Sequence, residues 1–225
     1  MKVLLIEDEK ELSASIETYL KQENYLCETA LTYNQAEEKI NLYQYDCIIV
    51  DISLPDGNGL DIIQELKENQ SETGIIIISA KNSLDDKLSG LGIGADDYLT
   101  KPFHLSELNA RIKSIIRRRN FSGKKELLFN EIRIIPEAMQ VFVNEKLIIL
   151  TKKEFDLLIY FLSNKDRVLT KESLAEHLWG EVMDTADSFD FIYTHIKNIR
   201  RKIMEKDGRD YIQTIYGMGY KFLSQ

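Results

Sequence analysis

Cysteine and long hydrophobic runs are both scarce in this sequence of 225 residues. The two cysteines, Cys27 and Cys47, stand in apolar surroundings without the spacing of metal ligands, so we expect two reduced, buried thiols in a cytoplasmic protein. No apolar run approaches the roughly 18 residues that a membrane-spanning helix needs, and we expect no membrane contact. The opening stretch MKVLLIEDEK turns acidic too soon for a signal peptide.

Acidic residues outnumber basic ones only in the first half of the chain. Residues 1–120 hold 13 Lys and Arg against 21 Asp and Glu, whereas residues 121–225 hold 16 of each kind. The change falls in RRRNFSGKKE, a polar stretch without apolar periodicity. We therefore predict two domains, an acidic one over 1–119 and a neutral one over 126–225, joined by a linker over 120–125.

In the first domain, short apolar runs alternate with helical patterns. The runs are VLLI (3–6), YLCETA (25–30), CIIV (47–50), IIIIS (75–79) and DYLT (97–100). Amphipathic patterns cover 10–24, 33–43, 59–69 and 84–91, and a last helix carries the stripe Leu105, Leu108, Ile112, Ile115 and Ile116. Strands that alternate with helices predict an α/β fold, a parallel sheet covered on both faces.

Polar side chains follow four of these strands at the point where each ends. They are Glu7 with Asp8, then Asp51, then Ser79, then Thr100 with Lys101. In open α/β sheets, sites form beyond the carboxyl ends of the strands where the strand order reverses. A strand order of 2-1-3-4-5 brings Glu7, Asp8 and Asp51 together at that edge.

Three carboxylates need a cation, because like charges raise one another's pKa. Hard, octahedral Mg²⁺ is commonly bound by one or two carboxylates together with waters and a phosphate oxygen. Lys101 adds a point charge and Ser79 a hydroxyl donor, so the set predicts a phosphoryl-transfer site that acts by positioning and electrostatics. Asp51, the central acid, is the candidate nucleophile and would form an acyl phosphate.

Taken singly, each of these elements has a more ordinary interpretation. An aspartate before a Pro/Gly loop is usually a turn former, and an acidic pair after a strand often caps the next helix. A calcium-binding EF-hand over 51–61 is excluded, because the side-chain ligand spacing is wrong and no closing glutamate follows. The prediction therefore depends on the joint order of the elements along the chain.

In that joint order, residues 1–119 resemble a response-regulator receiver domain. The matching stretches are LLIEDE, DCIIVDISLPDGNGLD, IIIISA, GADDYLTKPF and ELNARIKSIIRR. The resemblance implies a flavodoxin-like, doubly wound parallel sheet and a phosphoryl group accepted on Asp51 from a sensor histidine kinase. It also implies a Mg²⁺ site in which Asp8 is a direct ligand, Glu7 binds mainly through water, and Asp51 and the backbone carbonyl of Ser53 complete the set.

The same resemblance assigns three further roles. Ser79 would turn towards the phosphoryl group, Lys101 would bridge to it, and the Lys101–Pro102 bond would be cis. Tyr98 would be an aromatic switch that turns inward as Ser79 moves. The sequence departs from the common pattern at Glu7, where Asp is more frequent, and at Ser79, where Thr is, and both replacements keep the chemistry.

The second domain opens with β-like runs and continues with helices. The runs are ELLFN, IRIIP, QVFVN and KLIIL, within 126–150, and two helices follow as far as Trp179. Thr151 with Glu154 forms a capping box before the first of them, and Thr170 with Ser173 is a weaker start signal for the second.

A later helix, over 187–206, has an apolar stripe and a basic face. The stripe is Phe189, Ile192, Ile196, Ile199 and Ile203. The opposite face carries Thr194, Lys197 and Arg201, with Tyr193, Asn198 and Arg200 at its edges. Such a face is usually only a solvated surface. The tail YIQTIYGMGYKF, which reads as a β-hairpin with Gly217 and Gly219 at its turn, favours nucleic-acid binding instead.

Residues 126–225 resemble the winged-helix effector domain of OmpR/PhoB-type response regulators. The matching stretches are LTKKEFDLL, VLTKESLAEHLWG, THIKNIRRKI and IYGMGYKF. The resemblance implies an α+β winged-helix DNA-binding domain, with helix 188–205 in the major groove and the 215–221 wing, including Tyr216 and Lys221, on the backbone or minor groove. Asp190 and Tyr216 replace basic residues of the family, so these contacts should be weaker.

Together the two resemblances predict a two-component response regulator, a transcription factor that binds double-stranded promoter DNA. RNA polymerase is a further candidate partner. We expect a phosphoacceptor rather than an enzyme, with slow self-dephosphorylation as its one possible reaction. Two rival interpretations are a Mg²⁺-dependent phosphatase, which would need a substrate pocket, and a protein-binding adaptor, which would not bind DNA.

The family resemblance also suggests a homodimer when the protein is phosphorylated. The fourth helix, fifth strand and fifth helix would form its interface. The charged pairs predicted there are Lys87 with Glu107, Asp97 with Arg111, and Asp96 with Arg118. The alternative is that these charges pair within one chain or with water.

Overall fold

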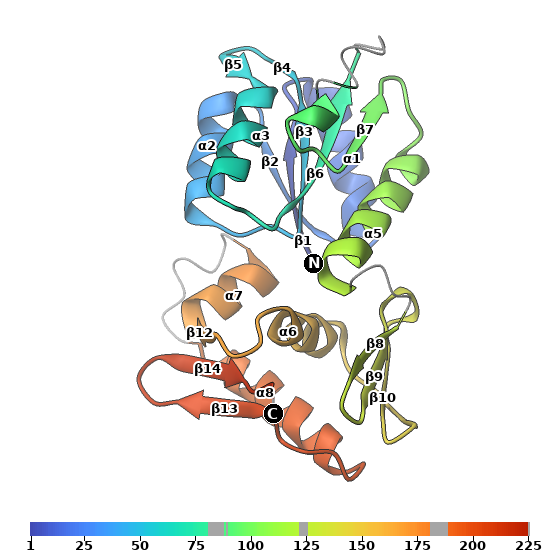
Figure 1. Cartoon of the computed structure of the whole chain (residues 1–225), viewed down its shortest axis with the longest axis vertical. Coiled ribbons are helices and arrows are strands. Elements are labelled where there is room, and N and C mark those ends of the chain that lie inside the picture. The colour runs from blue at the N-terminus through green and yellow to red at the C-terminus, as the bar shows by residue number, and fades with distance from the viewer. Residues whose placement is uncertain (81–87, 89, 122–125, 181–188, 225) are drawn as a thin grey trace. The chain divides into compact units, whose positions relative to one another are not determined.

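The computed structural model describes residues 1–80, 88, 90–121, 126–180 and 189–224. The chain divides into two compact units, Met1–Ser122 and Gly123–Gln225 (Figure 1). No helix among the described residues has both the length and the apolarity that crossing a membrane requires.

The first unit is built on a five-stranded parallel sheet of order β2-β1-β3-β6-β7. The strands are β1 (Lys2–Ile6), β2 (Leu26–Ala30), β3 (Cys47–Asp51), β6 (Gly74–Ser79) and β7 (Asp97–Thr100). All residues of β1, β3 and β6 are buried, which explains why these strands are continuously apolar rather than alternating. The predicted strand order and fold class are confirmed.

Helices cover both faces of this sheet. They are α1 (Lys10–Gln22), α2 (Tyr33–Leu42), α3 (Gly59–Glu68) and α5 (Leu105–Phe121). The helices α2 and α3 pack together on one face, and α1 and α5 on the other (Figure 1). Cys27 and Cys47 are buried and unpaired in the strands between them, as expected. Most of the predicted helix over 84–91 lies outside the described residues.

Two features of the first unit extend the sequence prediction. A short hairpin, β4 (Ser53–Leu54) with β5 (Gly57–Asn58), follows β3 directly. The last helix, α5, continues to Phe121 and so runs two residues into the stretch predicted as a linker.

The second unit begins with an antiparallel sheet of order β11-β10-β9-β8. Its strands are β8 (Leu127–Phe129), β9 (Ile132–Ile135), β10 (Gln140–Val143) and β11 (Lys146–Ile148), with a 3₁₀ turn, η1, at Pro136–Ala138. Each strand corresponds to one of the four predicted β-like runs.

Three helices and a second sheet complete this unit as a winged helix. The elements are α6 (Lys152–Ser163), β12 (Val168–Thr170), α7 (Lys171–Trp179), α8 (Asp190–Met204), β13 (Ile212–Ile215) and β14 (Gly219–Phe222). The predicted capping box of Thr151 and Glu154 opens α6, and the Thr170 side chain accepts a hydrogen bond from the Ser173 amide. The helix α8 buries its four isoleucines, whereas Phe189 precedes the helix and is only partly buried.

Candidate functional site

Three carboxylates meet at the carboxyl-end edge of the parallel sheet. Glu7 follows β1 and Asp51 ends the neighbouring β3, so parallel pairing brings the two together. One oxygen from each of Glu7, Asp8 and Asp51 lies within 4.8 Å of the others. Glu7 and Asp51 are buried, and Asp8 is exposed. The cluster is therefore open to solvent on the Asp8 side.

Lys101, which follows β7, joins this cluster. Its Nζ donates hydrogen bonds to Glu7 Oε1 at 2.9 Å and to Asp51 Oδ2 at 2.7 Å. Burial raises the pKa of Glu7 above its ordinary value, although Lys101 opposes that shift. Burial lowers the pKa of Lys101, but the hydrogen bonds to Asp51 and Glu7 outweigh it, so the net shift is upward. The lysine is thus held charged between two carboxylates.

The backbone around Asp51 is held by short-range contacts that the sequence analysis did not predict. The Ser53 amide donates to Asp51 Oδ1 at 3.1 Å, and the Gly59 amide donates to the Ile52 carbonyl at 2.9 Å. A Cβ at Gly59 would lie 2.0 Å from the Asp51 carbonyl oxygen, so only glycine fits there. The signal in the sequence was the glycine-rich loop itself, although its contact with Asp51 could not be read from it.

Ser79 and Tyr98 lie in the strands beside the cluster. Ser79 ends β6, is 1% exposed, and its carbonyl accepts the Lys101 amide at 2.8 Å. Tyr98, in β7, is 8% exposed, so its ring already faces inward in this structure. The Lys101–Pro102 peptide bond is cis.

The donor set of this cluster fits a divalent cation. Three carboxylates face one lysine, which leaves an excess of negative charge, and the three can supply oxygen atoms within the reach of one ion. Mg²⁺ prefers such oxygen ligands and usually needs only one or two carboxylates beside waters. The residues present are therefore suited to that ion.

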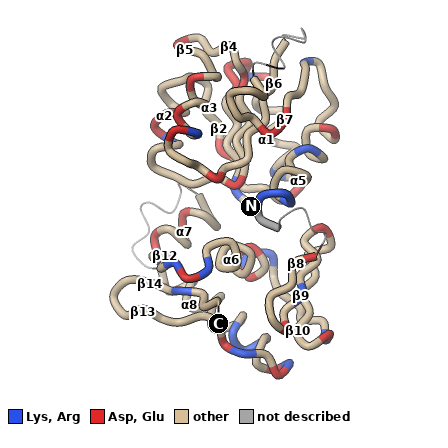
Figure 2. Tube along the Cα trace, viewed as in Figure 1, with Lys and Arg blue, Asp and Glu red and all other residues tan. Residues whose placement is uncertain are grey.

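On the second unit, the polar residues of α8 differ in exposure and in their contacts. Tyr193, Thr194, Lys197 and Arg201 are exposed, and Asn198 and Arg200 are partly buried. Figure 2 marks the Lys and Arg positions of the chain in blue. Arg200 pairs with Asp210 at 3.2 Å and donates to the Ile212 carbonyl and to Thr214 Oγ1. At the hairpin turn Tyr216 is 94% exposed, and Lys221 is partly buried.

The charges predicted for a dimer interface pair within the chain in this structure. Arg111 lies 2.7 Å from Asp97 and 2.8 Å from Glu107. Within this chain, Asp96 pairs with Arg119 at 2.8 Å, and the pairing of Asp96 with Arg118 of a second chain stays a prediction. Adjacent helical residues point about 100° apart, so Arg119 reaches the sheet while Arg118 is exposed. Lys87 lies outside the described residues.

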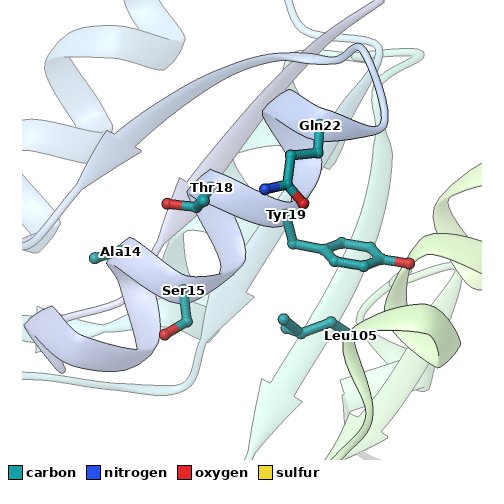
Figure 3. Close-up of a pocket in the computed structure, with 6 residues that line it drawn as sticks. All are labelled: Ala14, Ser15, Thr18, Tyr19, Gln22 and Leu105. Atoms are coloured by element: carbon teal, nitrogen blue, oxygen red, sulfur yellow. The ribbon is translucent and has the colours of Figure 1, made fainter.

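A pocket that the sequence analysis did not predict lies between α1 and the start of α5 (Figure 3). Its lining is uncharged: Ala14, Ser15, Thr18, Tyr19, Gln22 and Leu105.

Comparisons with known proteins agree with this arrangement. Residues 3–113 match the family described as "Response regulator receiver domain", and residues 144–222 match "Transcriptional regulatory protein, C terminal". The response regulator ArlR of Staphylococcus aureus is 39% identical over 220 residues, which is 97% of this chain and 98% of that protein.

Two solved structures are also similar. The OmpR/PhoB homolog DrrB of Thermotoga maritima is 31% identical, with a TM-score of 0.47, and the match covers 99% of this chain and 98% of that one. The receiver domain of Francisella response regulator 1452 is 34% identical, with a TM-score of 0.51, over 52% of this chain and 97% of that one.

A receiver domain and a transcriptional-regulator domain in one chain define a two-component response regulator rather than an enzyme of the usual kind. Within that class, the pairing of these two domains and the identity to ArlR assign the chain to the OmpR/PhoB-type family. Receiver domains of the class bind Mg²⁺ at an acidic pocket, and the cluster of Glu7, Asp8 and Asp51 is such a pocket. The family implies a sensor kinase and DNA as partners.

Proposed function

We propose that Asp51 accepts a phosphoryl group from a sensor histidine kinase, and that the modified protein dimerises and binds promoter DNA. The observation that carries this proposal is the convergence of Glu7, Asp8, Asp51 and Lys101 at one edge of the sheet. Asp51 is the only one of the three clustered acids that ends a central strand, and Lys101 contacts it directly.

In the proposed transfer, an oxygen of Asp51 attacks the phosphorus of a phosphohistidine. The new O–P bond forms as the N–P bond breaks, and the electron pair returns to the imidazole. Bound Mg²⁺ would supply charge compensation on the phosphoryl oxygens. Asp8 and Asp51 would be direct ligands, the Ser53 carbonyl a further one, and Glu7 would act mainly through water. Lys101 stabilises negative charge beside the acceptor oxygen.

The readout of phosphorylation would begin at Ser79. Its hydroxyl would turn to the phosphoryl group. Tyr98 would keep its inward position, which would leave the neighbouring surface accessible to a second chain. Lys87, Asp96, Asp97, Glu107, Arg111 and Arg118 are the proposed interface residues.

On DNA, α8 would enter the major groove and the β13–β14 hairpin would contact the backbone or minor groove. The proposed contacts are Tyr193, Thr194, Lys197, Asn198, Arg200, Arg201, Tyr216 and Lys221. Because Arg200 also binds the hairpin, we propose that it orients the wing against α8. The protein would act in the cytoplasm, where promoter DNA lies, and RNA polymerase is a further proposed partner.

The test is covalent labelling of the full chain with a small acyl phosphate in the presence of Mg²⁺. Mass spectrometry should show one added phosphoryl group, which Asp51→Asn abolishes because an amide is not a nucleophile of this kind. Asp61→Asn, which changes an exposed acid on α3, is the matched control and should label normally. Unchanged labelling of the Asp51→Asn protein would sink the assignment.

A further inference from the structure

The loop that follows Asp51 is anchored at its far end to a helix outside the acidic cluster. Asp56 lies in the turn between β4 and β5. Its Oδ1 accepts the Tyr33 amide at 2.6 Å, and its Oδ2 accepts the Asn34 amide at 3.1 Å. These amides begin α2, whose Thr32 cap satisfies the next one, from Gln35. Asp56 therefore satisfies two helix-end donors that would otherwise need water.

A second contact fixes the same turn. A Cβ at Gly57 would lie 2.8 Å from the Tyr33 ring, so the glycine backbone rests directly on that ring. At the near end of the hairpin, the Ser53 amide binds Asp51 Oδ1. The hairpin of 53–58 is thus held at both ends, by Asp51 on one side and by the start of α2 on the other.

Resting on the phosphoryl-acceptor function proposed above, we propose that Asp56 is a positioning residue for the Mg²⁺ site. By tying the hairpin to α2, it holds the Ser53 backbone and the Asp51 carboxylate in the orientation that metal binding requires. It is not one of the clustered carboxylates, so it acts through the hairpin and not as a ligand.

The charge state of Asp56 agrees with this role. Asp56 is exposed; slight desolvation raises its pKa, but the amides of Tyr33 and Asn34 outweigh that and lower the pKa below the ordinary aspartate value. The side chain is thus ionised near neutral pH and accepts both amides.

The experiment measures Mg²⁺ affinity of the full chain by titration calorimetry for three variants. Asp56→Ala removes the anchor, and Asp56→Asn removes the same charge but keeps one acceptor oxygen. Asp61→Ala removes an equal charge from an exposed site nearby. Groups that orient metal ligands typically contribute 10- to 100-fold in affinity. We expect roughly tenfold weaker binding for Asp56→Ala, an intermediate loss for Asp56→Asn, and none for Asp61→Ala.

Two outcomes would overturn the inference. Equal losses in the Ala and Asn variants would mean that only the charge matters. Unchanged Mg²⁺ affinity with a lower thermal unfolding midpoint would mean that Asp56 supports the fold alone. The proposed function is judged separately, by Mg²⁺-dependent labelling of Asp51 in the unmodified chain. That labelling can succeed while the Asp56 inference fails.

Discussion

Lys101 binds the same carboxylates that a metal ion needs. Its ammonium lies 2.7 Å from both Glu7 Oε2 and Asp51 Oδ2 and is largely shielded from solvent. In this structure the lysine therefore supplies the compensating charge for two buried acids. In the proposed phosphorylated state, with Mg²⁺ bound, the same ammonium would bridge to an anionic phosphoryl oxygen, so one residue would serve both states.

The Lys101→Ala variant separates the charge compensation of the two acids from the proposed bridging to the phosphoryl group. With a competing cation removed, Mg²⁺ affinity should hold or tighten by up to roughly tenfold, while phosphorylated protein should lose dimerisation. Titration calorimetry and sedimentation after acyl-phosphate treatment measure the two effects. Asp8→Ala is the opposing comparison, since it removes a proposed ligand and should weaken Mg²⁺ binding and phosphorylation together. A parallel loss of Mg²⁺ affinity in Lys101→Ala would show instead that the lysine holds the carboxylates in place.

At the scale of single elements, α8 divides its polar residues between two tasks. Lys197 and Arg201 are four residues apart, so they share one exposed face. Arg200 pairs with Asp210, in the loop before the hairpin, and donates to Thr214 of β13. Lys202, on a further face, pairs with buried Glu154 at 2.6 Å and ties α8 to α6. The face of Lys197 and Arg201, where Arg201 also pairs with Glu205 at 2.7 Å, is exposed and is the face proposed to read bases.

Replacing Lys197 and Arg200 should therefore give different losses of DNA binding. Lys197→Ala should weaken binding to a cognate site by about 1–3 kcal/mol if it reads a base, with the folded stability unchanged. Arg200→Ala should lower the unfolding midpoint and weaken binding to all sequences alike, because it releases the hairpin. Lys171→Ala, an exposed lysine on α7, is the charge-matched control. Fluorescence anisotropy with cognate and scrambled duplexes measures these affinities. Equal DNA binding by the Lys197→Ala and unmodified proteins would contradict the proposal that this face of α8 contacts DNA.

The elements also show what the sequence can and cannot predict. Strands such as 47–50 and the stripe of α8 were predictable, because burial imposes a period that the residues must follow. The β4–β5 hairpin was missed, since strands of two residues leave no alternation to detect. The ion pair between Asp96 and Arg119 within the chain was not predicted, because it joins residues 23 positions apart that no local pattern connects. The ion pair of Arg200 depends on a loop residue, Asp210, which no local pattern indicates.

At the acidic cluster, some features could be predicted from the sequence and others only seen in the structure. Strand order alone brings Glu7, Asp8 and Asp51 to one edge, so their meeting could be predicted. The tether of Asp56 to α2 could not, because it joins residues 22 and 23 positions apart through backbone amides that carry no sequence signature.

At the scale of the whole molecule, dimerisation must compete with contacts already made within the chain. Arg111 pairs with Asp97 and Glu107 in the structure. Forming an ion pair between chains would break an exposed ion pair within a chain. Each exposed pair stabilises by only about 0–1 kcal/mol. A two-fold interface repeats every pair, so the net gain is small. We therefore expect a weak, salt-sensitive dimer whose formation phosphorylation can control.

Mixing two single variants tests whether the Asp97–Arg111 pair forms between chains. Arg111→Glu and Asp97→Lys should each leave Asp51 labelling intact but weaken the phosphorylated dimer by about tenfold, or ~1.4 kcal/mol, because like charges then face each other. When the two variants are mixed, Asp97 of one chain faces Arg111 of the other and Glu faces Lys, so dimers should return. Pairing within a chain cannot be repaired in this way. Lys113→Glu is the control and should dimerise normally, because Lys113 lies on the α5 face that pairs with Glu23, the residue that caps the end of α1. Sedimentation at low salt measures the result, and a mixture that stays as monomeric as its components would contradict this interface.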